Sequence, residues 1–156
     1  MNRGSVARRR LKAWMGLDIR AKGELLLLAV MALAAEIAVK VVSLPRLTRA
    51  LGIRLAEGDR VPEPPVQGVD AMDEDLVARR AGAVDRLYRA WPRKSSCLRR
   101  ALVLGYRIRK ARPVLWIGVA KEDGTVRAHA WVEVDGRVVG DDTGDYAPLR
   151  SHKNAG

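Results

Sequence analysis

Two short stretches carry the residues that decide the fold. Residues 95–110 read SSCLRRALVLGYRIRK, and residues 126–142 read VRAHAWVEVDGRVVGDD. The first stretch contains Cys97, the only cysteine, and the second contains His129, one of two histidines. The second stretch ends on two aspartates. A thiol, an imidazole and a carboxylate are the groups of a cysteine nucleophile, its base and an orienting acid.

The first stretch predicts a helix that begins next to Cys97. Ser95 and Ser96 are favourable N-cap residues, and apolar residues follow at helical spacing. Cys97 then lies in the first turn, where unpaired backbone N–H groups and the helix dipole favour a thiolate. Arg99 and Arg100 add positive potential. The alternative is a small buried hydrophobic residue, the usual fate of a lone cysteine.

The second stretch predicts a β-strand over residues 126–134. Apolar side chains alternate along it and face one side, whereas His129 and Trp131 face the other. The dipeptide Asp135-Gly136 is a strong hairpin signal, and residues 137–140 form the returning strand. Taken alone, His129 would more often be an ordinary core or surface histidine.

The length of the hairpin turn determines which aspartate lies opposite His129. A two-residue turn pairs Val134 with Arg137. Continued along both strands, that register sets His129 opposite Asp142. A three-residue turn shifts the pairing by one residue and sets His129 opposite Asp141. The residues themselves leave both registers open.

The order of these residues resembles that of transglutaminase-like and papain-like cysteine enzymes. It is more similar still to the leader peptidases of lasso-peptide biosynthesis, the protease component often called the B protein. The segments that carry the resemblance are CLRRAL at 97–102, WIGV at 116–119, AHAWVEVDG at 128–136 and VGD at 139–141. The intervals of 32 residues from cysteine to histidine and 12 from histidine to aspartate fit as well.

The resemblance implies a role for each residue. Cys97 is the nucleophile, His129 the general base and Asp141 the third member, which favours the three-residue turn. The backbone N–H of Cys97 is the expected oxyanion donor. Gln67, the only glutamine, precedes the helix by thirty residues and is a poor candidate for that role.

The implied function is removal of the leader from a ribosomally made lasso-peptide precursor. The implied partners are the precursor peptide, a separate leader-binding protein (a RiPP recognition element) and an ATP-dependent lasso cyclase, with no cofactor or metal. One alternative is a transglutaminase-like acyltransferase or protease that acts on another protein. The other is a non-catalytic interaction module of the same fold.

The expected fold class is α+β, with N-terminal helices followed by a transglutaminase- or papain-like core in which the nucleophile helix packs on a small antiparallel sheet. The expected units are a basic, apolar helical extension (1–60), a Pro-rich linker (61–69) and the cysteine-peptidase core (70–156). Within them, the sequence predicts helices over 24–44, 46–55 and 70–89, a further strand over 114–120 and a polar tail over 145–156.

Charge is concentrated in the N-terminal part of the chain. The net charge is +11, and residues 1–60 hold 12 lysines and arginines against 5 acidic residues, a net of +7. This charge suggests an anionic partner, either an acidic peptide or protein or a membrane surface. The basic N-terminal part is also the expected docking surface for the separate leader-binding protein. Nucleic acid is disfavoured, because aromatic residues make up only 4% of the chain. One cysteine excludes an internal disulfide, which suits the cytoplasm.

Residues 24–44 form the most apolar segment. An uninterrupted apolar run ends at Glu36, and Lys40 follows four residues later. Two charges inside a membrane span are costly, so a buried or interfacial helix is favoured over a true span. Weak membrane association through this segment is a further prediction.

Overall fold

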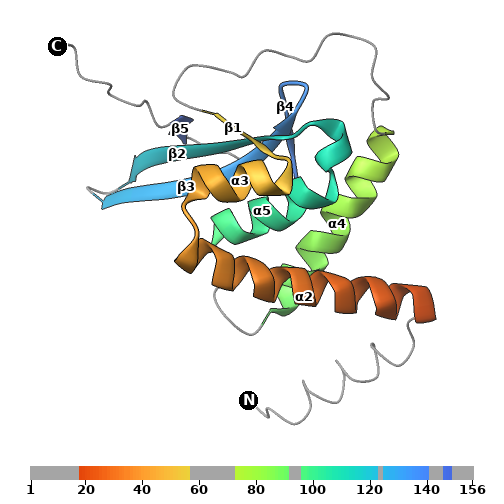
Figure 1. Cartoon of the computed structure of the whole chain (residues 1–156). Coiled ribbons are helices and arrows are strands. Elements are labelled where there is room, and N and C mark those ends of the chain that lie inside the picture. Colours follow the sequence, from red (N-terminus) through yellow and green to blue (C-terminus); the bar gives the residue numbers. More distant parts are fainter. Residues whose placement is uncertain (1–17, 57–72, 92–95, 123–124, 141–145, 149–156) are drawn as a thin grey trace, which may run out of the picture.

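The computed structural model describes residues 18–56, 73–91, 96–122, 125–140 and 146–148. Its elements follow in the order α2 (Ile19–Val41), α3 (Leu44–Leu51), β1 (Arg54–Leu55), α4 (Glu74–Ala90), α5 (Cys97–Arg107), the 3₁₀ turn η1 (Arg109–Ala111), β2 (Val114–Glu122), β3 (Thr125–Val134), β4 (Arg137–Val139) and β5 (Ala147–Pro148). Figure 1 shows the sheet on one side, α5 beneath it with α4 alongside, and α2 as the outermost layer. The fold class is α+β, as predicted.

The sheet is mixed rather than purely antiparallel. β2 pairs antiparallel with β3 and with β5, and β3 pairs antiparallel with β4. β1 pairs with β2 in parallel. Parallel neighbours need a long crossover, and α4 and α5 supply it between β1 and β2. Because Arg54–Leu55 form this strand, the helix predicted over 46–55 is wrong at its end and stops at Leu51.

The first helices begin and end at other residues than the sequence predicts. The segment predicted over 24–44 is helical only to Val41. Pro45 lies in the first turn of α3, where a residue needs no N–H partner. α4 is capped by the side chain of Asp73. Asp70, where the sequence predicts that this helix begins, lies outside the described residues.

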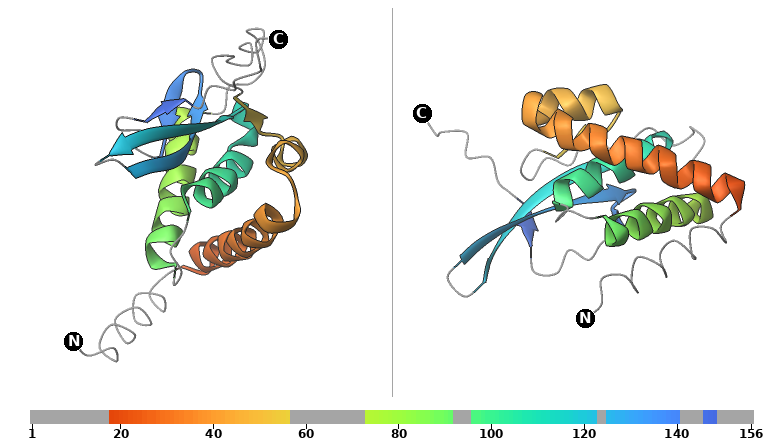
Figure 2. Two further views of the ribbon diagram at one scale, coloured as in Figure 1. Left: turned by 90° about the vertical axis from the view of Figure 1, so that its left-hand side faces the viewer. Right: turned by 90° about the horizontal axis from the view of Figure 1, so that it is seen from below.

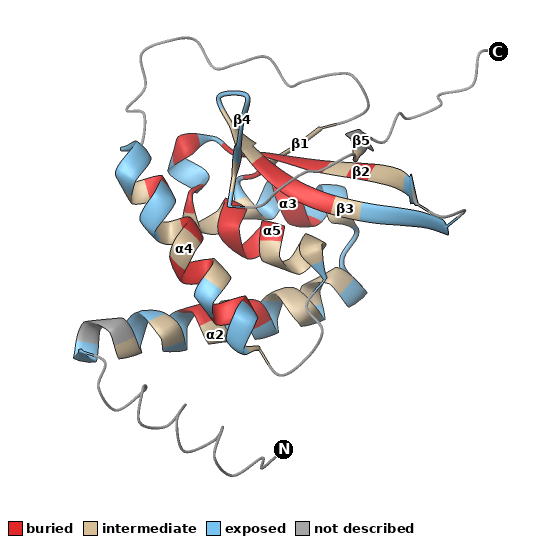
Figure 3. Cartoon of the chain, turned by 180° about the vertical axis from the view of Figure 1, so that it is seen from behind, coloured by how far each residue is buried: buried red, intermediate tan, exposed pale blue. Residues whose placement is uncertain are grey.

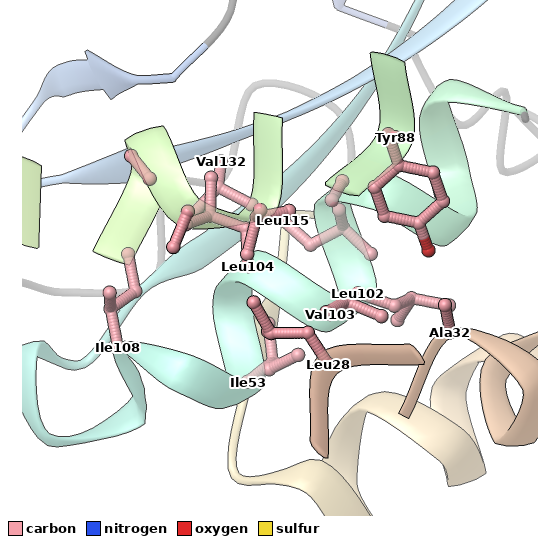
Figure 4. Close-up of a cluster of buried hydrophobic side chains, with 14 of the residues drawn as sticks. Leu28, Ala32, Ile53, Tyr88, Leu102, Val103, Leu104, Ile108, Leu115 and Val132 are labelled. Carbon is pink, nitrogen blue, oxygen red and sulfur yellow. The ribbon is translucent and has the colours of Figure 1, made fainter. Parts of the chain in front are cut away.

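One core joins the N-terminal helices to the rest of the described chain. Leu28 and Ala32 of α2 are fully buried, in the same cluster as Leu102 of α5 and Val132 of β3 (Figure 4). Burying a leucine or valine side chain stabilises the fold by about 1.5–3 kcal/mol, so α2 contributes directly to the stability of the sheet. The predicted linker at 61–69 lies outside the described residues, and the division at its two ends stays a prediction.

Burial is concentrated where α5 meets the sheet. Figure 2 shows the layers from two further directions, with the long β2–β3 hairpin extending past the helices. Figure 3 shows that the far end of this hairpin is exposed, whereas the middle of α5 and the adjoining parts of the strands are buried. In the parts of the chain that the structure describes, no helix combines the length and the apolar character that crossing a membrane requires.

Candidate active site

Cys97 is the first residue of α5, as the capping serines predict. Ser96 is the N-cap, and its hydroxyl oxygen accepts a hydrogen bond from the backbone N–H of Arg99 at 3.4 Å. Ser95, the other candidate cap, lies outside the described residues. The half-buried thiol therefore lies among the N–H groups of a helix start, which can stabilise negative charge that develops nearby.

The sulfur of Cys97 contacts the strand that carries His129. It lies 3.9 Å from the backbone carbonyl oxygen of Ala128, a weak S–H···O contact. Ala128 and His129 share a peptide bond, so the sulfur is no more than about 6.5 Å from the backbone nitrogen of His129. Two residues far apart in the sequence are thus brought together where α5 meets β3.

Aromatic rings surround His129. Its ring centroid lies 4.8 Å from that of Tyr146 and 6.1 Å from that of Trp131. Trp131 stacks in turn on Trp116 of β2, and both indoles are buried in a second, smaller cluster. Ala130 and Val132 on the other face of β3 pack in the main core, so the predicted two-faced pattern is confirmed for this half of the strand. The rings restrict the orientation of the imidazole and shield one side of it from water.

Tyr146 is the residue that sequence reasoning missed. It belongs to residues 145–156, which the sequence predicts as a polar tail, yet Ala147–Pro148 form β5 on the edge of β2. Gly118 of β2 lies opposite both Pro148 and His129. Because Gly118 has no side chain, the phenol ring can approach the imidazole across it. The run of apolar residues that begins at Tyr146 was the available signal.

The β3–β4 hairpin has the shorter of the two predicted turns. Val134 pairs with Arg137, and Asp135 and Gly136 have positive φ angles of 50° and 75°. Two successive left-handed residues form the mirror-image turn whose twist matches that of the flanking strands. The three-residue turn that the resemblance favours is therefore wrong.

The turn does not by itself select the aspartate. The β3–β4 ladder ends at the Val132–Val139 pair, and Gly140 has a φ angle of 79°, which takes the chain off the strand path. Asp141 and Asp142 lie outside the described residues. The assignment of Asp141 as the third member stays a prediction.

Gly140, the residue before Asp141, is held on the nucleophile helix. Its carbonyl oxygen accepts a hydrogen bond from the guanidinium group of Arg100, which also pairs with Asp85 of α4 at 3.0 Å. A Cβ at this position would press on side chains of both α4 and α5. The segment that leads to Asp141 therefore starts from a fixed point relative to Cys97.

A second set of contacts joins α5 to α2. The carboxylate of Glu36 accepts a hydrogen bond from the indole N–H of Trp91 at 3.1 Å and pairs with Arg99 at 3.7 Å. Burial, with the negative charge of Glu36 as the next cause, raises the pKa of Tyr88 to about 12. Both arginines that follow Cys97 are thus paired with acids, which partly neutralises the positive potential predicted near the thiol.

A cavity of about 730 Å³ lies between α4 and β4 and reaches Gly140. Neither Cys97 nor His129 lines it, so this cavity is not where the thiol and imidazole would meet a substrate. Among the described residues, no three His, Cys, Asp or Glu side chains gather as a metal site would require.

A family model described as the transglutaminase-like superfamily matches residues 38–151, which is more than half of the chain. The chain belongs to this superfamily. The matched region includes Cys97, His129 and Asp141. Searches of curated proteins and of solved structures found no match. Membership in the transglutaminase-like superfamily agrees with the α+β fold and with a cysteine-peptidase-like domain, and it does not specify a substrate.

Proposed function

We propose that this transglutaminase-like protein is a cysteine peptidase that removes the leader from a lasso-peptide precursor. The main support is the contact between the sulfur of Cys97, at the start of α5, and the backbone of β3 next to His129. The resemblance of residues 97–141 to lasso leader peptidases supports the substrate class.

In the proposed reaction, His129 takes the proton of Cys97 and the thiolate attacks the carbonyl carbon of the scissile peptide bond. The backbone N–H of Cys97 stabilises the oxyanion of the tetrahedral intermediate. The C–N bond then breaks, and His129 gives its proton to the amine of the departing core peptide. Water attacks the remaining thioester with His129 as base, which releases the leader with a new carboxylate and restores the thiol.

Asp141 is proposed to hold the imidazole of His129 in the tautomer that accepts the thiol proton. The hydrogen bond from Arg100 to the carbonyl oxygen of Gly140 supports this role, because it fixes the residue before Asp141 on the nucleophile helix. The aromatic contacts of His129 support it as well, since they restrict the rotation of the ring.

The proposed partners follow from the same resemblance. They are the precursor peptide, a separate leader-binding protein and an ATP-dependent lasso cyclase, acting in the cytoplasm without a cofactor. The described residues include no unit that we assign to leader binding, so the reaction is best tested with that partner present.

The test is mass spectrometry of a precursor peptide incubated with the full chain and a leader-binding protein. Wild type should cut a single bond, and Cys97→Ala and His129→Ala should each cut at least about 1,000-fold more slowly. Val126→Ala is the matched control, because Val126 is 68% exposed on the same strand as His129 and should leave the rate unchanged.

Each other result has a definite meaning. Cleavage by Cys97→Ala at the wild-type rate would refute the assignment of Cys97 as the nucleophile. If wild type does not cleave the precursor although the leader-binding partner binds both the peptide and the protein, the peptidase assignment fails. Incorporation of a labelled primary amine into a glutamine side chain, with release of ammonia and without cleavage, would indicate the acyltransferase alternative.

A further inference from the structure

The outer face of α2 carries a stripe of exposed apolar side chains. Figures 1 and 2 show α2 on the side of the molecule away from the sheet. The side chains recur at spacings that place them on one side of the helix. This outer stripe consists of Ile19, Leu26, Val30, Leu33, Ile37 and Val41, which are 49–80% exposed.

The inner face of α2 is apolar too. Leu28 and Ala32 are fully buried in the main core. A helix that needs only one apolar face for the core ordinarily carries polar residues on the other. Large contiguous apolar patches are rare on the surface of monomeric proteins and mark sites of interaction. Packing of the described residues therefore leaves the outer stripe exposed.

A cationic flank borders the N-terminal half of the same helix. A cavity of about 390 Å³ beside Leu27 and Met31 is lined by arginines and a lysine, and a second of about 450 Å³ lies beside Glu24. Of the described residues that line these two cavities, six are cationic and Glu24 is the one acid. The six cations of this flank are Arg79, Arg80, Arg86, Arg107, Arg109 and Lys110.

The sequence that leads into α2 has the same sign of charge. Residues 1–22 contain seven lysines and arginines and one acidic residue. Glu24 itself is paired with Arg107 of this flank. Apolar side chains next to concentrated positive charge are the combination by which helices lie in the interface of anionic membranes.

We propose that the outer face of α2 docks this protein on an anionic membrane surface. The outer stripe enters the boundary between headgroups and acyl chains, and the cationic flank contacts lipid phosphates. Docking does not cover the start of α5, because Arg99 pairs with Glu36 and its neighbours pack in the main core, on another side of α2 than the outer stripe. A second copy of the chain is disfavoured as the occupant, since it carries the same net charge of +11 and the same cationic flank.

The test is flotation of the full chain with lipid vesicles. One set is pure phosphatidylcholine, and in the other about a third of the lipid is phosphatidylglycerol. Wild type should bind the anionic vesicles at least about tenfold more tightly than the neutral ones. The double variants Leu26→Gln/Leu33→Gln and Arg79→Gln/Lys110→Gln should each weaken that binding by at least about tenfold, with unchanged melting temperatures.

Two control variants match these changes elsewhere on the surface. Val126→Gln removes an apolar side chain that is as exposed as Leu26 (68% against 69%), and Lys121→Gln removes an exposed charge on β2. Both should bind anionic vesicles within about twofold of wild type, because neither residue belongs to the outer stripe or the cationic flank.

Any of four outcomes would overturn the proposal. Equal binding to neutral and anionic vesicles would show that the cationic flank does not contribute to vesicle binding. Anion-dependent binding that the stripe variant does not weaken would indicate general electrostatic attraction of a basic protein to the vesicles. Anion-dependent binding that inorganic phosphate abolishes would indicate a site for free phosphate. A dimer in analytical ultracentrifugation that the stripe variant dissociates, without vesicle binding, would make the outer stripe a protein interface.

Discussion

Replacing Gly140 with alanine tests whether the residue before Asp141 must be held between α4 and α5. Gly140 has a φ angle of 79°, and an L-residue in this region costs about 1–2 kcal/mol. The new Cβ would also lie 3.1 Å from Cδ2 of Leu104 and 3.3 Å from Cβ of Ala81. The methyl group of Leu104 can rotate away, but Cβ of Ala81 is fixed to the backbone of α4. Crowding therefore adds about 1–3 kcal/mol, and the free energy of unfolding should fall by about 2–5 kcal/mol.

Gly136→Ala is the matched control. Gly136 has a φ angle of 75°, but a Cβ there would meet nothing within 4 Å, so only the backbone cost of about 1–2 kcal/mol applies. Urea denaturation measures both losses. In the precursor-cleavage assay, with both variants folded, Gly140→Ala should be at least about tenfold slower and Gly136→Ala unchanged. Equal losses of stability in the two variants, or wild-type cleavage by Gly140→Ala, would refute the reasoning.

Two more predictions concern the contacts behind the nucleophile helix. Glu36→Gln removes the charge that faces Arg99, so the free energy of unfolding should fall by about 1–3 kcal/mol. Chemical denaturation measures this loss. A change below about 0.5 kcal/mol would mean that the ion pair contributes nothing to stability. Between about pH 10 and pH 12 the protein should lose up to about 2 kcal/mol of stability through Tyr88, because its pKa is about 12 in the folded state against 10.0 ordinarily and the unfolded state releases its proton first. Tyr88→Phe should lack this part of the loss, and equal pH dependence in variant and wild type would contradict the assignment.

The start of α5 was accessible to sequence reasoning because its signals are local. Ser96 precedes the helix and caps an N–H three residues later, and the apolar spacing that follows needs no knowledge of distant residues. The alternation along β3 is local in the same sense. The expectation that Cys97 lies near His129 then followed from the resemblance to cysteine enzymes in which a helix with the cysteine precedes a strand with the histidine.

The hairpin turn shows where the resemblance misled. The three-residue turn follows from the position of Asp141 only if the returning strand continues straight to that residue. The left-handed backbone of Gly140 breaks the strand first, so the position of the aspartate carries no information about the turn. The backbone at Asp135 and Gly136 is instead determined by the twist of the strands that the turn connects.

Long-range contacts were beyond the sequence for a different reason. β1 and β5 are two residues long, and two residues have no periodicity from which to predict a strand. The ring contact of Tyr146 with His129 and the ion pair of Glu36 with Arg99 join residues whose neighbours in the sequence give no sign of the partner. Such contacts appear only when the elements are packed.

The two arginines that follow Cys97 bind in different directions, Arg99 to Glu36 on α2 and Arg100 to α4 and to Gly140. The ends of helices ordinarily fray, at almost no cost in free energy. Fraying at the start of α5 would instead break contacts with three other segments at once. Opening of the first turn therefore costs more free energy than fraying of an unattached helix end, and the thiol is presented by a helix end that is held from three sides.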